Sequence, residues 1–290
     1  MIIGRDTVTK EFTGLAAAQA LGHAYLFYGP AMAGKRTFAL ALAHFLEKGS
    51  FTPPADGEVL QDGMVIDAAF AAQLDPDKKG GSVGIDAVRA IREFLWQRPI
   101  VSPRRTLILD DAERMTSEAQ NAILKIAEEP PASSLIILIA SDPEGLLPTI
   151  LSRVEKIYFG TVPEGEIAAW LAKERKFPAA EAKRFAARAF GRPGLALRLT
   201  EDMKLRTDLE LAEKLLTAAP SARRDLIKEI LEPEDFDLPS FLGAMALVLA
   251  GEKPGKTRTI LWHRVLALSD RAAHAALNPR LQLEGLFVGE

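Results

Sequence analysis

The feature that most constrains the fold is a glycine-bounded loop between an apolar run and a helical pattern. The run from Ala24 to Tyr28 is followed at once by Gly29-Pro-Ala-Met-Ala-Gly34-Lys35-Arg36-Thr37. After this loop, apolar residues recur at the spacing of one helix face, at Phe38, Ala41, Leu42, Phe45 and Leu46. A strand, a tight loop and a helix in this order begin a βαβ unit. The segment therefore predicts a parallel sheet with helices packed against it.

Further apolar runs extend this pattern over the first 160 residues. They are Thr106 to Leu109, Leu135 to Ala140 and Lys156 to Phe159. Compact runs of this kind suit strands that are buried on both faces of a parallel sheet. A second helical spacing, from Ala119 to Ala127, follows a capping box expected at Ser117 and Gln120. The polar stretches 49–63 and 75–82 are expected as loops.

The second half of the chain has a different character. From Pro163 onward only helical spacing is present, interrupted at proline and glycine positions. We expect an α/β part over residues 1–160, a short helical group over 161–200 and a longer all-α segment over 201–290.

The composition excludes several classes of protein. With 48% hydrophobic and 26% charged residues, the chain is globular and not disordered, collagen-like or a coiled coil. It has no cysteine and four scattered histidines, which excludes disulfides, a thiolate zinc site and a cysteine nucleophile. A net charge of -3 does not suit a chain that binds nucleic acid alone. No apolar run is long enough to cross a bilayer and no leader pattern precedes the first loop, so we expect a cytoplasmic protein.

The loop from Gly29 to Gly34 has the composition of a phosphate-binding loop. Its backbone N–H groups and the following helix N-terminus would form an anion pocket, and Lys35 would reach the terminal phosphates. A hydroxyl after that lysine normally ligates magnesium, but Arg36 holds this position. Thr37 lies about 100° further round a helix of 3.6 residues per turn and cannot substitute. The alternative without a binding role is a strand-to-helix turn with a surface lysine.

Polar residues follow two of the other expected strands. Asp110 and Asp111 come directly after Leu109, as the Walker B carboxylates of an ATPase do. Asp111 is one methylene shorter than the glutamate that polarises water. Ser141 follows the run to Ala140 and could sense a terminal phosphate. The alternatives are solvated or capping aspartates and a plain strand cap.

A single arginine and a cluster of three arginines are further candidate functional residues. Arg153, with Ser152 before it, offers a rigid donor fork that can act on a phosphate in trans as an arginine finger. The common alternative is a surface ion pair. Arg98, Arg104 and Arg105 form a basic cluster that is expected in a solvated turn, with a phosphate backbone as the second possibility.

Four motifs carry a family resemblance. They are His23-Ala-Tyr-Leu-Phe-Tyr-Gly-Pro, Asp110-Asp-Ala-Glu-Arg-Met, Asn121-Ala-Ile-Leu-Lys-Ile-Ala-Glu128-Glu129-Pro130-Pro131 and Leu147-Pro-Thr-Ile-Leu-Ser-Arg. In this order they resemble the AAA+ subunits of the bacterial DNA polymerase III clamp loader, and most closely its delta-prime branch. The resemblance is dense over the first 160 residues. It extends through Gly191-Arg-Pro-Gly-Leu-Ala and returns weakly at Asn278-Pro-Arg-Leu-Gln-Leu-Glu-Gly-Leu-Phe.

The resemblance implies an architecture and a function. The fold would be a RecA-like AAA+ parallel-sheet domain (1–160) with a degenerate P-loop, a helical lid (161–200) and an all-α collar (201–290) that joins five subunits into an open ring. The delta-prime branch is a rigid stator that does not turn over ATP. Arg153 would reach the γ-phosphate bound by a neighbour, and Phe241 to Leu249 would help to bury collar against collar.

The resemblance also implies partners. These are the delta and gamma/tau clamp-loader subunits, the sliding clamp indirectly, and primed DNA only within the assembled ring, with no membrane contact. No cofactor is required, and weak ATP or ADP binding at Lys35 is left open.

This sequence departs from the family pattern at several places. Most relatives carry four zinc-binding cysteines after the first helix, whereas here the short stretch 49–63 stands in their place, so no zinc is expected. The usual Ser-Arg-Cys triplet ends in Val154, which keeps an apolar packing role. The sensor arginine of ATP-hydrolysing relatives falls at Gly194. With Arg36 and Asp111, this loss favours a stator.

Two other functions compete with the stator. An ATP-hydrolysing motor subunit of the gamma/tau type is supported by the intact Lys35 and Asp110. A small-molecule kinase with a P-loop has less support, because the helical half offers no acceptor site.

Overall fold

The described structure forms two compact units. The computed structural model describes residues 2–74, 82–234, 236–251, 255–275 and 277–287. One unit comprises Met1–Ala182 with Gly191–Leu195, and the other comprises Lys183–Phe190 with Ala196–Glu290. We call them the N-terminal and C-terminal units. The segment expected as a lid, 161–200, is shared between the two, and the three-part division at 160 and 200 stays a prediction.

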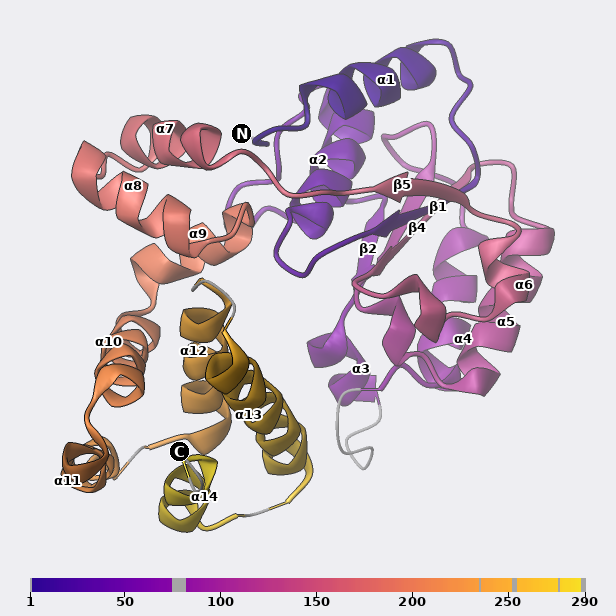
Figure 1. Cartoon of the computed structure of the whole chain (residues 1–290). Helices are drawn as coiled ribbons and strands as arrows, with labels where there is room; N and C mark the ends of the chain where they lie inside the picture. Colours follow the sequence, from indigo (N-terminus) through magenta and orange to yellow (C-terminus); the bar gives the residue numbers. More distant parts are fainter. Residues whose placement is uncertain (1, 75–81, 235, 252–254, 276, 288–290) are drawn as a thin grey trace. The chain divides into compact units, whose positions relative to one another are not determined.

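A five-stranded parallel sheet lies at the centre of the N-terminal unit (Figure 1). Its strand order is β2-β3-β4-β1-β5. The strands are β1 (Ala24–Tyr28), β2 (Gly63–Ile66), β3 (Arg105–Leu109), β4 (Ser134–Ala140) and β5 (Glu155–Tyr158). Four of them confirm the strands expected at the apolar runs, while β2 begins at the last residue of a stretch expected as a loop. The burial expected on both faces is wrong for β5, because it is an edge strand whose residues are mostly exposed. Because all strands run the same way, the sheet has an amino edge, where they begin, and a carboxyl edge, where they end.

Helices cover both faces of this sheet. They are α1 (Asp6–Ala17), α2 (Lys35–Lys48), α3 (Ala68–Leu74), α4 (Ile85–Leu95), α5 (Ser117–Glu128) and α6 (Pro148–Leu151), with the short 3₁₀ turns η1 (Ala112–Arg114) and η2 (Pro143–Gly145). The next helix of this unit, α7 (Glu164–Glu174), does not lie on the sheet (Figure 1). Two further helices, α8 (Ala179–Arg188) and α9 (Pro193–Glu201), cross between the units.

Alternating side chains of the strands build two cores. On one face, Leu26 and its sheet neighbours pack with α4 and α5. On the other face, Phe27 packs with α1 and α2 through Phe12 and Phe38, whose ring centroids lie 5.6–5.7 Å apart in edge contacts. Alternation of this kind follows from the two-residue period of a strand. Burial on both faces explains why the central strands β1, β3 and β4 are mainly apolar.

The C-terminal unit is a helical bundle. It contains α10 (Met203–Thr217), α11 (Pro220–Ile230), α12 (Leu238–Ala250), α13 (Lys256–His274) and α14 (Pro279–Leu286). Helix α12 packs against α10 and α13, and Phe241, Leu242, Ala244 and Met245 are fully buried there. These side chains build the core of their own unit, whereas residues 246–248 of the same helix are only half-buried. The burial of Phe241 to Leu249 against neighbouring collars stays a prediction. No helix among the described residues is long and apolar enough to span a membrane.

Candidate functional site

The predicted phosphate-type loop leaves β1 at the carboxyl edge of the sheet. Gly29 has a φ of 133°, and a Cβ there would collide with the carbonyl oxygen of Phe159. Gly34 has a φ of 93° and directly precedes α2. Only glycine adopts these conformations without strain. The strand, loop and helix that the sequence predicted are confirmed.

Lys35 closes this loop on itself. Its ammonium group donates to the carbonyl oxygens of Gly29 (2.5 Å) and Pro30 (2.8 Å), and the residue is only 5% exposed. Burial lowers the pKa of Lys35, although the charges of Glu113, Asp110 and Asp111 act in the opposite direction. A phosphate would have to compete with the loop carbonyls for this ammonium group.

Arg36 holds two carboxylates together at the carboxyl edge. Its guanidinium lies 3.1 Å from Oδ2 of Asp110 and 3.0 Å from Oδ2 of Asp67. Burial raises the pKa of Asp110, and Asp111 adds to this, while Arg36 opposes it. Burial would also raise the pKa of Asp67, but hydrogen bonds from the Phe70 N–H and Arg36, with the charge of Arg36, lower it overall. Arg36 thus occupies the place of the magnesium-ligating hydroxyl with an ion-pair network.

Two further residues that the sequence placed in this site are Thr37 and Asp111. Thr37 lies exposed on α2. Asp111 adopts a left-handed conformation (φ 51°), and its N–H donates to Oδ1 of Asp110 at 3.2 Å. Asp67 was not predicted as a site residue. It directly follows strand β2, which ends at the same edge of the sheet as the strand before Asp110.

Glu113 is a second acidic residue that the sequence reasoning passed over. Its Oε1 accepts a hydrogen bond from the N–H of Ser141 at 2.8 Å, and its Oε2 is buried without a hydrogen-bond partner. Ser141 itself is exposed at the end of β4. The structure thus brings Ser141 together with Glu113, from the first turn after β3. A carboxylate four residues after a strand end carries no sequence signal by itself, since only the pairing of β3 with β4 places it here.

The residue expected at the sensor-arginine position packs against the phosphate-type loop. The N–H of Gly194 donates to the carbonyl oxygen of Met32 at 2.9 Å. A Cβ at Gly194 would lie 3.0 Å from that oxygen and 3.1 Å from Cβ of Met32. This close approach leaves little room for a side chain at position 194.

Arg153 lies near the opposite, amino edge of the sheet. Its guanidinium makes an ion pair with Oε1 of Glu128 at 2.8 Å and donates to the carbonyl oxygen of Thr149 at 3.1 Å. A longer contact of 3.3 Å joins it to the hydroxyl of Ser152, which in turn donates to Thr149. The Arg153 side chain is 40% exposed. Arg153 is therefore both oriented and accessible.

Strand register separates Arg153 from the loop of its own chain. Strand β5 begins at Glu155, which pairs with Tyr25, whereas the loop starts after Tyr28, which pairs with Tyr158. At about 3.3 Å per residue, the levels of Tyr25 and Gly29 are roughly 13 Å apart. Since Arg153 precedes β5, its side chain cannot reach a phosphate bound at the Lys35 loop of the same chain.

The basic cluster does not form the solvated turn or the phosphate contact that the sequence suggested. The guanidinium of Arg104 donates to the carbonyl oxygens of Leu21 (2.9 Å) and Gly22 (2.8 Å). Arg105 is 5% exposed, lies 4.9 Å over the ring of Phe94 and donates to the carbonyl oxygen of Arg98. Both predictions are wrong for Arg104 and Arg105, because the surrounding loops use them as internal donors. Of the three, Arg98 alone is exposed.

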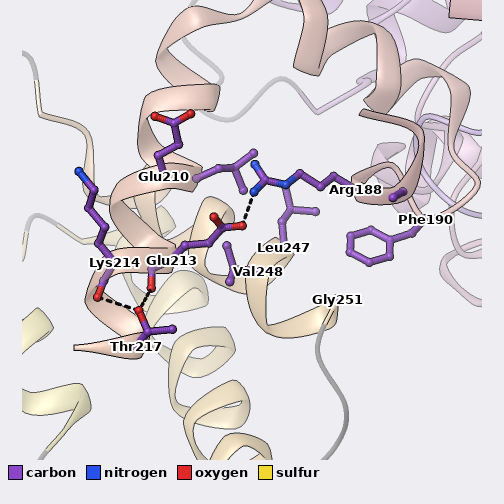
Figure 2. Close-up of a pocket in the computed structure, with 11 residues that line it drawn as sticks. Arg188, Phe190, Glu210, Glu213, Lys214, Thr217, Leu247, Val248 and Gly251 are labelled. Carbon is purple, nitrogen blue, oxygen red and sulfur yellow. Dashed lines mark hydrogen bonds and ion pairs between the residues drawn. The ribbon is translucent and has the colours of Figure 1, made fainter. Parts of the chain in front are cut away.

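A separate cavity of about 680 Å³ lies in the C-terminal unit (Figure 2). Its lining includes apolar side chains such as Leu247 and Val248 and an ion pair between Arg188 and Glu213. The hydroxyl of Thr217 donates to the carbonyl oxygen of Glu213 at 2.7 Å. None of the site residues predicted from the sequence lines this cavity.

A comparison with protein families gives one match over more than half of the chain. A family model described as DNA polymerase III, delta subunit matches residues 4–163. This range contains the phosphate-type loop, the strand that ends at Asp110, and Arg153.

Individual relatives and a solved structure agree with this match. The chain is 32% identical over 187 residues to the DNA polymerase III subunit gamma/tau of Mycobacterium tuberculosis, covering 59% of this chain and 30% of that protein. It is 32% identical over 148 residues to the DNA polymerase III subunit delta' of Escherichia coli, covering 51% and 44%. A DNA polymerase III gamma subunit-related protein of Thermotoga maritima shares the fold, with a TM-score of 0.58, 22% identity and coverage of 97% and 96%. The matched parts therefore span less than half of each curated relative.

Proposed function

This chain belongs to the family of DNA polymerase III delta subunits, and on that premise we propose that it is a clamp-loader subunit of the delta-prime type. It acts as a stator in DNA replication. In the assembled loader it supplies an arginine finger to a neighbouring ATPase subunit, so that the sliding clamp is loaded onto primed DNA.

The observation that carries the proposal is the position of Arg153. The guanidinium is oriented by Glu128 and Thr149, exposed, and near the edge of the sheet opposite the chain's own phosphate-type loop. An arginine that cannot reach the phosphate-type loop of its own chain, but is oriented and exposed at the surface, suits action on a neighbouring subunit. In other NTPases an arginine in trans stabilises the charge that develops on the γ-phosphate and raises the rate by roughly 10³ to 10⁵.

The chain's own site supports a stator more than a motor. Arg36 replaces the magnesium-ligating hydroxyl, the ammonium group of Lys35 is bonded to its own loop, and Gly194 packs where relatives place a sensor arginine. The second candidate is an ATP-hydrolysing motor of the gamma/tau type. It is favoured by the identity to gamma/tau subunits and by the retained Lys35 and Asp110.

The proposed partners follow from the family. They are the delta and gamma/tau subunits, with the sliding clamp reached indirectly and primed DNA contacted only within the ring. The proposal requires no zinc and no nucleotide in this chain, and it places the protein in the cytoplasm.

The test is clamp- and DNA-stimulated ATP hydrolysis by the loader reconstituted with its cognate subunits. We expect the isolated chain to be inactive and Arg153→Ala to silence the adjoining site, so that the ring loses a large share of its turnover. The Arg153 ion pair is exposed and contributes about 0–1 kcal/mol, so the variant should fold normally. Arg89→Ala, which removes another exposed ion pair, is the matched control and should keep the full rate.

Two results would contradict the proposal. Hydrolysis by the isolated chain would make it a motor. Full turnover in the Arg153→Ala ring, with the variant incorporated normally, would reduce Arg153 to a surface ion-pair partner.

A further inference from the structure

The fold implies a magnesium ion at the carboxyl edge of the sheet, and the residues of this chain do not fit one. In a nucleotide-binding relative, the ion would lie between a hydroxyl at position 36 and the carboxylate of Asp110. We propose that the guanidinium of Arg36 is a built-in cation that takes the place of magnesium in this chain. This inference does not depend on the role of Arg153.

Geometry is the first argument. The guanidinium contacts Oδ2 of Asp110 at 3.1 Å and Oδ2 of Asp67 at 3.0 Å through two different nitrogens. Magnesium requires oxygen ligands at about 2.0–2.1 Å in near-octahedral arrangement. The side chain that should have supplied one of those oxygens supplies only N–H donors. A metal ion and the Arg36 guanidinium therefore compete for the same carboxylate oxygens.

Charge is the second argument. Asp110 and Asp67 are partly buried, with side chains 19% and 27% exposed, and Asp111 follows Asp110 directly. Carboxylates gathered in this way need a cation to offset their repulsion and their loss of water. Lys35 is committed to the loop carbonyls. The cation in direct contact with both Asp67 and Asp110 is that of Arg36.

The residue type suits this role. Arginine stays charged at every physiological pH and presents nitrogens in a fixed fork, so one side chain can bridge two carboxylates from different strands. Here it joins α2 to the ends of β2 and β3, and thus ties the helix that follows the phosphate-type loop to two neighbouring strands.

The test is Mn²⁺ binding, as a spectroscopic stand-in for Mg²⁺, measured by electron paramagnetic resonance on the full chain without nucleotide. We expect Arg36→Thr to uncover Asp67 and Asp110 and to bind Mn²⁺ at least about tenfold more tightly than the unmodified chain. Arg36→Lys keeps a cation and should not gain the site. Arg89→Thr, which also exposes a carboxylate by removing an arginine, should behave like the unmodified chain.

A second set of variants tests whether the Mn²⁺ site gained in Arg36→Thr is formed by Asp110. Asp110→Asn in the Arg36→Thr background should abolish the added Mn²⁺ binding, and circular dichroism checks that each variant is folded. The proposal is overturned if the unmodified chain already binds Mn²⁺ tightly and Asp110→Asn alone removes that binding. This comparison uses only the unmodified chain and Asp110→Asn. It can therefore overturn the proposal even if Arg36→Thr does not fold. Folded Arg36→Thr without added affinity overturns it as well.

Discussion

Replacing Asp62 with alanine should remove the anchor of the loop that leads into β3. The Asp62 side chain is fully buried. Its carboxylate accepts hydrogen bonds from the N–H groups of Ile100, Val101 and Ser102, each at 2.8 Å, and lies 3.5 Å from Nε of Arg105. The same loop exposes the side chains of Ile100 and Val101. A single carboxylate therefore gathers three backbone donors and a buried guanidinium.

The magnitude follows from what alanine would leave behind. Hydrogen bonds to charged groups contribute about 1.5–3 kcal/mol each, and truncating one partner of a buried ion pair costs about 3–5 kcal/mol. Because these groups act together, the contributions do not add. We expect Asp62→Ala to lower the free energy of unfolding of the N-terminal unit by about 4 kcal/mol. Asp62→Asn keeps one acceptor oxygen and should cost about half as much.

The pH dependence provides a second signature. Burial would raise the pKa of Asp62, but the hydrogen bonds from Ser102, Val101 and Ile100, with the charge of Arg105, lower it overall. A lowered pKa in the folded state contributes stability that is present above the unfolded value of about 3.9 and is lost as the pH falls through the folded value. The difference between the unmodified chain and Asp62→Asn should therefore be constant near neutral pH and shrink only below about pH 4.

Urea unfolding followed by far-ultraviolet circular dichroism measures the global effect. Hydrogen exchange of a peptide covering residues 98–104 reports the loop itself, whose amides should lose protection in Asp62→Ala. Asp86→Ala, which removes an exposed carboxylate paired with Arg89, is the control and should change stability by less than about 1 kcal/mol. A loss below 1 kcal/mol in Asp62→Ala at pH 7, with protection retained, would refute the reasoning.

Two further predictions concern the neighbourhood of the site. Gln120 is buried, donates to the carbonyl oxygen of Gly145 (3.1 Å) and accepts from the N–H of Leu147 (2.8 Å), so Gln120→Leu should destabilise the chain by about 1–3 kcal/mol in urea titrations; an unchanged midpoint would mean that water replaces these bonds. Gly194→Arg should force the Met32 backbone aside and cost about 1–3 kcal/mol in thermal unfolding, without creating ATP hydrolysis in the isolated chain. Activity in that variant would show that the position can still accept a sensor arginine.

The central strands and the two main helices of the N-terminal unit were predictable because each carries its own pattern. Strands β1, β3 and β4 contain long apolar runs, and β5 was located from the short run that ends at Phe159. The edge strand β2 was not, because it has only three apolar residues, Met64 to Ile66, after a long polar stretch. The start of α5 was misplaced by one residue. Thr116, with extended backbone, caps the helix by accepting from the Ala119 N–H, whereas Ser117 lies inside it.

The candidate site divides in the same way. Gly29, Gly34, Lys35 and Arg36 were predictable because consecutive residues of one loop define them. Their partners come from distant parts of the chain that only strand pairing brings together, as Asp67 does after β2. Glu128 was visible as part of a motif, but its ion pair with Arg153 depends on the end of α5 meeting the turn before β5. Arg104 and Arg105 were misjudged because sequence shows charge but not which carbonyl groups lie within reach.

The direction of the strands gives the chain a chemical polarity. Under the proposed function, the amino edge offers an arginine to a neighbour, while at the carboxyl edge Arg36 occupies the position that a neighbour's arginine would help to activate. Such a subunit has one productive flank. Under the same proposal, the parallel arrangement of β1 and β5 would restrict the order of subunits around a ring, since Arg153 could serve an ATPase on one side only.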